Sequence, residues 1–213
     1  MEYTVIKSKK RKRTTEIKII DNKVVIYAPF YLSMDEIDKI YNKYKDKLLM
    51  KIEKSNNNDG YLCYLGNKYL IEVVKSKLLT NTFCELENDK FLVYIPEKKE
   101  IDIKEVINKW KIEQAKQIIT ERVKFYTDRY DFRFDFIKNT IKFKNQKTRW
   151  GSCSFDNNLN FNYNVITKNL DVIDYLVVHE LTHTLIKNHS KIFWDKVKSV
   201  IGNYKELRKE LRV

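Results

Sequence analysis

The chain has 213 residues, with 42 Lys and Arg against 29 Asp and Glu, which gives a formal net charge of +13. This length accommodates one or two small domains with a sizeable core. Plentiful aromatic and β-branched residues exclude a disordered chain, and no segment approaches the roughly 18 consecutive apolar residues of a membrane-spanning helix. We therefore expect a globular protein with no membrane partner.

The first half of the chain alternates strand-like segments with one helix. Ser33 and Glu36 have the spacing of a capping box, in which each side chain bonds to the other residue's backbone N–H, so we expect a helix from Met34 to about Lys54. Alternating apolar residues and turn signals predict strands around it, and Pro96 ends the last one. The expected strands cover residues 2–8, 14–20, 24–29, 61–64, 68–74, 82–86 and 90–95.

The second half begins with a long helix. Asp102 opens it, and apolar residues at helical spacing continue to about Tyr130. Three shorter strands (residues 140–144, 148–154 and 159–165) and two further helices follow. We predict an α+β protein. It has a β-rich N-terminal domain with one helix over residues 1–100. A second domain, over 101–213, consists of the long helix, a small sheet, the histidine-bearing helix and a C-terminal helix.

All three histidines of the chain lie between residues 179 and 189. His179, Glu180 and His183 form the pattern H-E-x-x-H, which on a helix places two imidazoles at i and i+4 on one face, close enough to bind one cation. A helix is expected here because apolar residues recur at helical spacing, with Asn169 or Asp171 available as the N-cap. The glutamate beside the first histidine is then in reach of a metal-bound water as a general base.

His189 is the third expected ligand, and it requires a turn. On a straight helix it would lie roughly 15 Å along the axis from His179, so the helix must end and the chain must fold back. Asn188 is a suitable stopping residue because Asn tolerates the left-handed conformation, and Ser190 is suited to cap a second helix from Lys191 to about Gly202. Three neutral imidazoles leave a fourth tetrahedral position for water, as in a catalytic zinc site.

The resemblance to a known family rests on several segments of the second half. These are Thr148-Arg149-Trp150-Gly151-Ser152-Cys153-Ser154, Leu159-Asn160-Phe161-Asn162, Asp174 to His183, Asn188-His189-Ser190 and Phe193-Trp194. Together they resemble the YgjP-like zinc metallopeptidase family, and the order of strands and helix in the first half is similar to it as well. The resemblance implies a zincin-like core, distantly related to SprT-like proteases, with zinc on His179, His183 and His189 and Glu180 as the base. Metzincin proteases carry Gly where this chain has Ile186, which argues against that group.

Several other residues have open roles. The strand at 159–165 or the one at 148–154 is the candidate to pair with an extended peptide substrate, with an ordinary hairpin as the alternative. Arg149 is a candidate to contact substrate or an oxyanion, or to belong to a structural hydrogen-bond network. Tyr204 is a candidate hydroxyl donor or a packing residue. Trp150, Phe193 and Trp194 are expected to be core aromatics beside the metal, Cys153 a small buried residue, and Gly151 a site of bulging or close backbone approach.

The sequence thus predicts a zinc-dependent metallopeptidase in which Glu180 assists the attack of water on a peptide bond of a peptide or protein substrate. Manganese, iron and cobalt stay possible at a three-imidazole site. Two other functions are open: a nucleic-acid-associated basic protein, which includes a protease of nucleic-acid-bound proteins, and a catalytically silent zinc-binding scaffold. The nucleic-acid function depends on the basic run from Lys7 to Arg13. The alternative is that this run lies on a solvated face and has no function.

The cysteines and the N-terminus indicate the compartment. Cys63, Cys84 and Cys153 are odd in number and form no C-x-x-C motif, which is typical of reduced thiols. No apolar segment or small-residue cleavage site follows the basic run, as a secretory signal peptide requires. We therefore expect a cytoplasmic protein.

Overall fold

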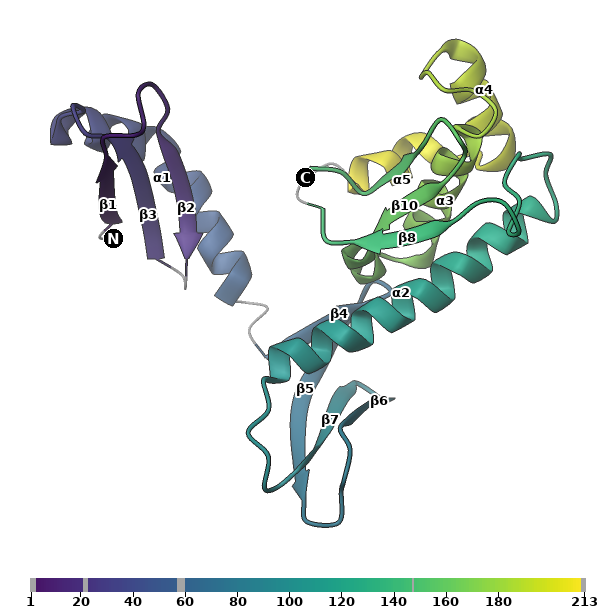
Figure 1. Ribbon diagram of the computed structural model, residues 1–213, viewed down its shortest axis with the longest axis horizontal. Helices are drawn as coiled ribbons and strands as arrows, with labels where there is room; N and C mark the ends of the chain where they lie inside the picture. The colour runs from purple at the N-terminus through teal and green to yellow at the C-terminus, as the bar shows by residue number, and fades with distance from the viewer. Residues whose placement is uncertain (1–2, 21–22, 57–59, 147, 212–213) are drawn as a thin grey trace. The chain divides into compact units, whose positions relative to one another are not determined.

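The computed structural model describes residues 3–20, 23–56, 60–146 and 148–211, and the chain forms two compact units, residues 1–60 and 61–213. Residue 2, the expected start of the first strand, lies outside the described residues. The first unit contains β1 (Tyr3–Ser8), β2 (Glu16–Ile20), β3 (Lys23–Pro29) and α1 (Met34–Asn56). Its sheet has the order β1-β3-β2, with β1 parallel and β2 antiparallel to β3 (Figure 1).

The first unit has its own small core. Ser33 opens α1 as expected: Glu36 accepts a hydrogen bond from the Ser33 backbone N–H at 2.9 Å, and the Ser33 hydroxyl accepts one from the Glu36 N–H at 3.3 Å. The helix then packs Ile37 and Tyr41 on the alternate residues of β3 that point inward. The buried members of this core are Val24, Ile26, Ala28, Ile37 and Tyr41.

The second unit holds two sheets and the remaining helices. Its first sheet consists of β4 (Tyr61–Tyr64), β5 (Asn67–Ser76), β6 (Phe83–Glu87) and β7 (Lys90–Pro96) in the order β4-β5-β7-β6. The second consists of β8 (Ile141–Lys144), β9 (Gly151–Cys153) and β10 (Leu159–Asn162) in the order β8-β10-β9. The helices are α2 (Ile103–Thr127), the short 3₁₀ helix η1 (Tyr163–Thr167), α3 (Leu170–Thr182), α4 (Lys191–Val200) and α5 (Tyr204–Glu210).

Helix α2 connects the parts of the second unit. Figure 1 shows it running between the β4–β7 sheet and the layer that contains β8, β10 and α3. Its N-cap Asp102 accepts a hydrogen bond from the Lys104 N–H at 2.8 Å, and Ala115, Ile119 and Val123 on one face are fully buried. These residues share one continuous apolar cluster with β7 and with α3.

The α+β class is confirmed, but the compact units divide after Gly60, whereas we expected the boundary near residue 100. The physical reason is the burial of β7. Phe91 and Val93 are fully buried in the same apolar cluster as Ala115 of α2, so the β4–β7 sheet has no separate core.

A bidentate ion pair fixes α3 to α2. The Arg122 guanidinium donates from Nε to Oδ1 of Asp174 at 2.5 Å and from Nη2 to Oδ2 at 2.7 Å, and both side chains are largely buried. Asn169 caps α3 by accepting the Val172 N–H at 3.0 Å. These contacts position the helix that carries His179. No helix in the described parts of the chain combines the length and apolar character that crossing a membrane requires.

Candidate metal centre

The structure brings the three histidines together at the junction of α3 and α4. His179 lies in the last turn of α3, His183 is its C-cap, and His189 comes directly before Ser190, the N-cap of α4. Nε2 of His189 lies 3.1 Å from Nε2 of His179 and 3.2 Å from Nε2 of His183. Among the described residues, we find one group of His, Cys, Asp or Glu side chains whose ligand atoms lie close enough together to bind one metal ion, and these three histidines form it.

The separations of the nitrogen atoms fit a tetrahedral cation. Zinc–imidazole bonds of ~2.0–2.1 Å at the tetrahedral angle place two nitrogens ~3.3 Å apart, close to the 3.1 and 3.2 Å observed. His183 donates from Nδ1 to the carbonyl of Ile186 at 3.0 Å, which leaves the Nε2 lone pair free for a metal. Nδ1 of His179 is buried with no hydrogen-bond partner among the described residues. The donor set is therefore positioned to bind a metal ion.

The chain folds back earlier than expected. Helix α3 ends at Thr182, not near Asn188, and Asn188 is not among the described residues with a positive φ. The reason lies in the threonines: Thr182 Oγ1 donates to the Val178 carbonyl at 2.7 Å and Thr184 Oγ1 to the Leu181 carbonyl at 2.6 Å. Thr184 Oγ1 also accepts the Arg133 N–H at 2.9 Å, so contacts with another segment terminate the helix.

Aromatic rings hold the imidazoles in place. Phe193 of α4 is fully buried, and its ring centroid lies 5.0, 4.5 and 4.8 Å from those of His179, His183 and His189. Trp194 stacks on His189 with a centroid distance of 5.5 Å. Both aromatics lie beside the metal centre as expected.

Burial keeps the imidazoles neutral. It is the main cause that lowers the pKa of His179 to about 3, with smaller contributions from the charges of His183, His189 and Arg208. Burial also lowers the pKa values of His183 and His189. Neutral imidazole is the form that binds a metal, so the site is ready to bind a cation at neutral pH.

Glu180 lies buried next to the histidines, with 4% of its surface exposed. Burial raises the pKa of its carboxyl group to about 8, and the opposing attraction of Arg149 is smaller. Its Oε2 has no hydrogen-bond partner among the described residues. Gly151 makes room for it: a Cβ atom at this position would lie 2.6 Å from Oε1 of Glu180. This is the close approach that the glycine suggested.

The edges of the small sheet distinguish between the two candidate substrate strands. Strand β10 pairs with β8 on one side and β9 on the other, so its backbone is already occupied. Strand β9 lies at the edge of this sheet. A cleft, which we call the site cleft, runs beside it in two parts. Both parts are lined by Gly151, His179 and Glu180.

Three other residues have clearer roles in the structure. Arg149 is exposed and makes no hydrogen bond with another described residue, so the expected structural network is absent there. Tyr204 is buried against Trp194 with a centroid distance of 5.4 Å, which fits packing. Cys153 is half-buried and lines the site cleft, and burial raises the pKa of its thiol.

Two cleft residues escaped the sequence analysis. Lys187, in the turn between α3 and α4, donates to the Ser154 carbonyl at 2.8 Å and to Asn157 Oδ1 at 2.7 Å. Arg208 lies on α5, a helix that we did not expect, and lines the other part of the cleft. The available signal was the spacing of Tyr204 and Arg208, one turn apart on a single helix face.

A buried glutamate beside the two imidazoles of an H-E-x-x-H pattern, with a third imidazole converging on them from the turn that follows, is the arrangement of a metallopeptidase. A family model described as "YgjP-like, metallopeptidase domain" matches residues 13–213. The chain therefore belongs to the YgjP-like metallopeptidase family.

Solved structures with similarity to part of this chain include one metallopeptidase zymogen. The metallopeptidase zymogen of Pyrococcus abyssi abylysin is 20% identical, with a TM-score of 0.33, over 48% of this chain and 89% of that chain. No curated protein sequence matches.

Proposed function

We propose that the chain is a zinc-dependent peptidase that hydrolyses peptide bonds, with His179, His183 and His189 as the ligands and Glu180 as the general base. The observation that carries this proposal is the convergence of three Nε2 atoms beside a buried carboxyl group. When bound, zinc supplies a Lewis acid that polarises the substrate carbonyl and lowers the pKa of water to about 7. Zinc is the default for three imidazoles, and metal analysis decides between it and manganese, iron or cobalt.

Glu180 moves the proton. Its carboxylate accepts a proton from the attacking water and donates it to the leaving amine, because the same group serves as base and then as acid. A buried carboxyl with a pKa near 8 is a strong base, and the positive charge of a bound cation lowers that value toward neutrality. Gly151 keeps the carboxyl group close to the histidines.

The substrate would lie along β9. An extended peptide forms backbone hydrogen bonds with the free edge of a strand, and β9 is the strand of the small sheet that borders the histidines with an edge position. Residues Gly151 to Cys153 then hold the scissile bond beside Glu180. The proposed substrate class is therefore a peptide or a protein segment in an extended conformation.

The test compares the wild type with Glu180→Gln in a peptide-library digest, with metal analysis on the same samples. We expect both proteins to retain zinc and only the wild type to produce cleavage products. Glu121→Gln changes an exposed glutamate on α2 and serves as the matched control, which should cleave like the wild type. Equal cleavage by Glu180→Gln would refute the assigned base.

The silent-scaffold alternative makes a different prediction. It requires that chelation unfolds the protein and that no peptide is cut under any condition. The buried carboxyl group beside the ligands speaks against it, because a closed structural site has no need of a base.

A second candidate function, nucleic-acid binding, has support from the first unit. Six of the seven residues from 7 to 13 are Lys or Arg. Phe30 and Tyr31, next to them, are 60% and 68% exposed. Lys9 Nζ lies 5.4 Å from the Phe30 ring centroid, and the Tyr31 hydroxyl donates to the Lys12 carbonyl at 3.0 Å. Cations beside exposed rings suit single-stranded nucleic acid, whose bases stack on aromatic side chains.

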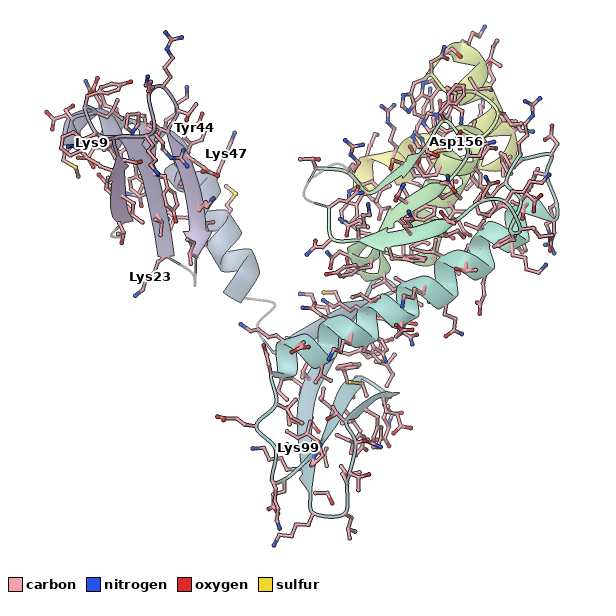
Figure 2. All side chains as sticks on the ribbon, viewed as in Figure 1. Lys9, Lys23, Tyr44, Lys47, Lys99 and Asp156 are labelled. Carbon is pink, nitrogen blue, oxygen red and sulfur yellow. The ribbon has the colours of Figure 1, made fainter. Side chains whose placement is uncertain are left out.

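Salt titration with a fluorescent single-stranded oligonucleotide tests this candidate. Binding should weaken steeply as the salt concentration rises. Lys9→Ala should make the slope of the logarithm of the binding constant against the logarithm of salt concentration shallower by about one. Lys23→Ala, at the opposite end of the same sheet (Figure 2), is the control for loss of one charge. Equal effects of the two variants would assign binding to net charge alone.

The cysteines support the cytoplasmic location that we also propose. Cys63, Cys84 and Cys153 are all free. Free thiols persist in reducing compartments. Cell fractionation with a tagged chain tests the location.

A further inference from the structure

One cation of the site cleft is not used by the proposed chemistry. Arg208 lines the part of the cleft that also contains Gly151, His179 and Glu180. Its guanidinium lies 4.5 Å from the centroid of the Trp194 ring. That ring also stacks on His189 at 5.5 Å and on Tyr204 at 5.4 Å. The arginine is therefore positioned by the aromatics that support the metal centre.

The guanidinium has no anionic partner in the described parts of the chain. Among the described residues, Arg208 forms no salt bridge and no hydrogen bond. The other cation of the cleft differs: Lys187 uses its ammonium group on Ser154 and Asn157. Glu180 is the one carboxyl group among the residues that line the two parts of the cleft. A fixed guanidinium with unused donors therefore lies within the cleft.

We propose that Arg208 binds a carboxylate of the substrate next to the reacting bond. The planar guanidinium offers two parallel N–H groups to a carboxylate, and stacking on Trp194 presents them without a large loss of side-chain freedom. The inference rests on the proposed function, because in a peptide substrate the anionic groups are carboxylates. They come from two sources: the C-terminal carboxylate or an Asp or Glu side chain near the scissile bond.

A hydrolysis experiment separates these sources. One pair of peptides ends in a free carboxylate or in an amide, and a second series carries Asp or Asn at each position around the scissile bond. We expect the wild type to favour one acidic form over its neutral partner by about tenfold or more in kcat/KM, the effect of one charge-assisted interaction. The pair that shows the preference identifies the source.

The variants assign the preference to one side chain. In Arg208→Gln the ratio of acidic to neutral kcat/KM should fall to about one, and Arg208→Lys should retain part of it. Arg129→Gln is the matched control, since its guanidinium also stacks on a ring, that of Phe125 at 3.8 Å, but lines neither part of the cleft. An acidic preference that survives Arg208→Gln would overturn the inference, as would the absence of any preference in the wild type.

A binding experiment makes the inference independent of turnover. The zinc-loaded Glu180→Gln protein is titrated with the acidic and neutral peptides while the indole N–H resonance of Trp194 is observed. The acidic peptide should shift this resonance and bind about tenfold tighter, and adding Arg208→Gln should abolish the difference. Equal binding of both peptides would refute the role of Arg208. Absence of cleavage by the wild type together with this binding difference would refute the peptidase activity while leaving the carboxylate site in place.

Discussion

Replacing Glu180 by Gln should stabilise the metal-free protein in a manner that depends on pH. Glutamine has nearly the same shape and occupies the space that Gly151 leaves, but it cannot ionise. The pKa of the Glu180 carboxyl group rises from 4.5 to about 8 on folding because of burial. A group whose folded pKa is the higher one destabilises the fold increasingly as pH rises between the two values, because the unfolded state releases its proton there while the buried carboxyl group of the folded state retains it.

The magnitude follows from the interval between the two pKa values. Each pH unit well inside this interval costs the wild type about 1.4 kcal/mol, so between pH 5 and pH 7 the stability of the variant relative to the wild type should grow by about 2.5 kcal/mol. The variant also buries an amide that lacks a partner, which costs about 1–3 kcal/mol at every pH. The change with pH is therefore diagnostic, whereas the absolute difference is not.

Urea unfolding of both metal-free proteins at pH 5, 6 and 7 measures this difference, and the histidine contributions cancel because both proteins share them. Hydrolysis should fall by a factor of about 10² to 10⁴, the usual contribution of a general base, with zinc retained. Glu121→Gln, exposed on α2, should show no dependence of its stability difference on pH. A constant gap between Glu180→Gln and the wild type across this pH range would show that the carboxyl group is not buried as described.

Three further changes test the site and its support. His189→Ala should lower zinc affinity more than about 100-fold in chelator competition, because it removes one of the three metal ligands and not just a residue that hydrogen-bonds to a ligand. Gly151→Ala should lower kcat about 100-fold without loss of zinc, since its Cβ would displace the Glu180 carboxyl group. Asp174→Ala should lower the free energy of unfolding in urea by about 3 kcal/mol, because Arg122 keeps its charge in a largely buried position.

Each of these changes has a matched control. Lys191→Ala is an exposed substitution two residues from His189 and should leave zinc affinity unchanged. Gly202→Ala adds a Cβ that meets no atom within 4 Å, so its kcat should equal that of the wild type. Asp128→Ala removes an exposed partner of Lys124 and should cost less than about 1 kcal/mol. A control that changes as much as its test variant would contradict the corresponding contact.

The sequence predicted what depends on local pattern. Most strands and both long helices follow from alternation, helical spacing and the caps at Ser33, Asp102 and Asn169. The approach of His189 to the other two histidines was expected because we took it as the third ligand, and helix geometry then required the chain to turn between His183 and His189. The assigned roles of these residues remain predictions until metal and activity are measured.

What the sequence could not provide depends on contacts between distant segments. The end of α3 at Thr182 depends on a hydrogen bond from Arg133, which no local pattern encodes. The boundary after Gly60 depends on the packing of β7 against α2. Arg208 reaches the cleft through its stacking on Trp194, a contact between two helices that the spacing of residues along α5 does not reveal.

The turn between α3 and α4 links the metal to the shape of the cleft. It carries His183 and His189 as well as Lys187, whose ammonium group ties the turn to the connection between β9 and β10 through Ser154 and Asn157. In the function that we propose, a cation bound by the imidazoles would therefore also hold the wall of the site cleft in position. Its removal would then free the turn next to β9 as well as take away the Lewis acid, so we expect chelation to weaken peptide binding together with hydrolysis.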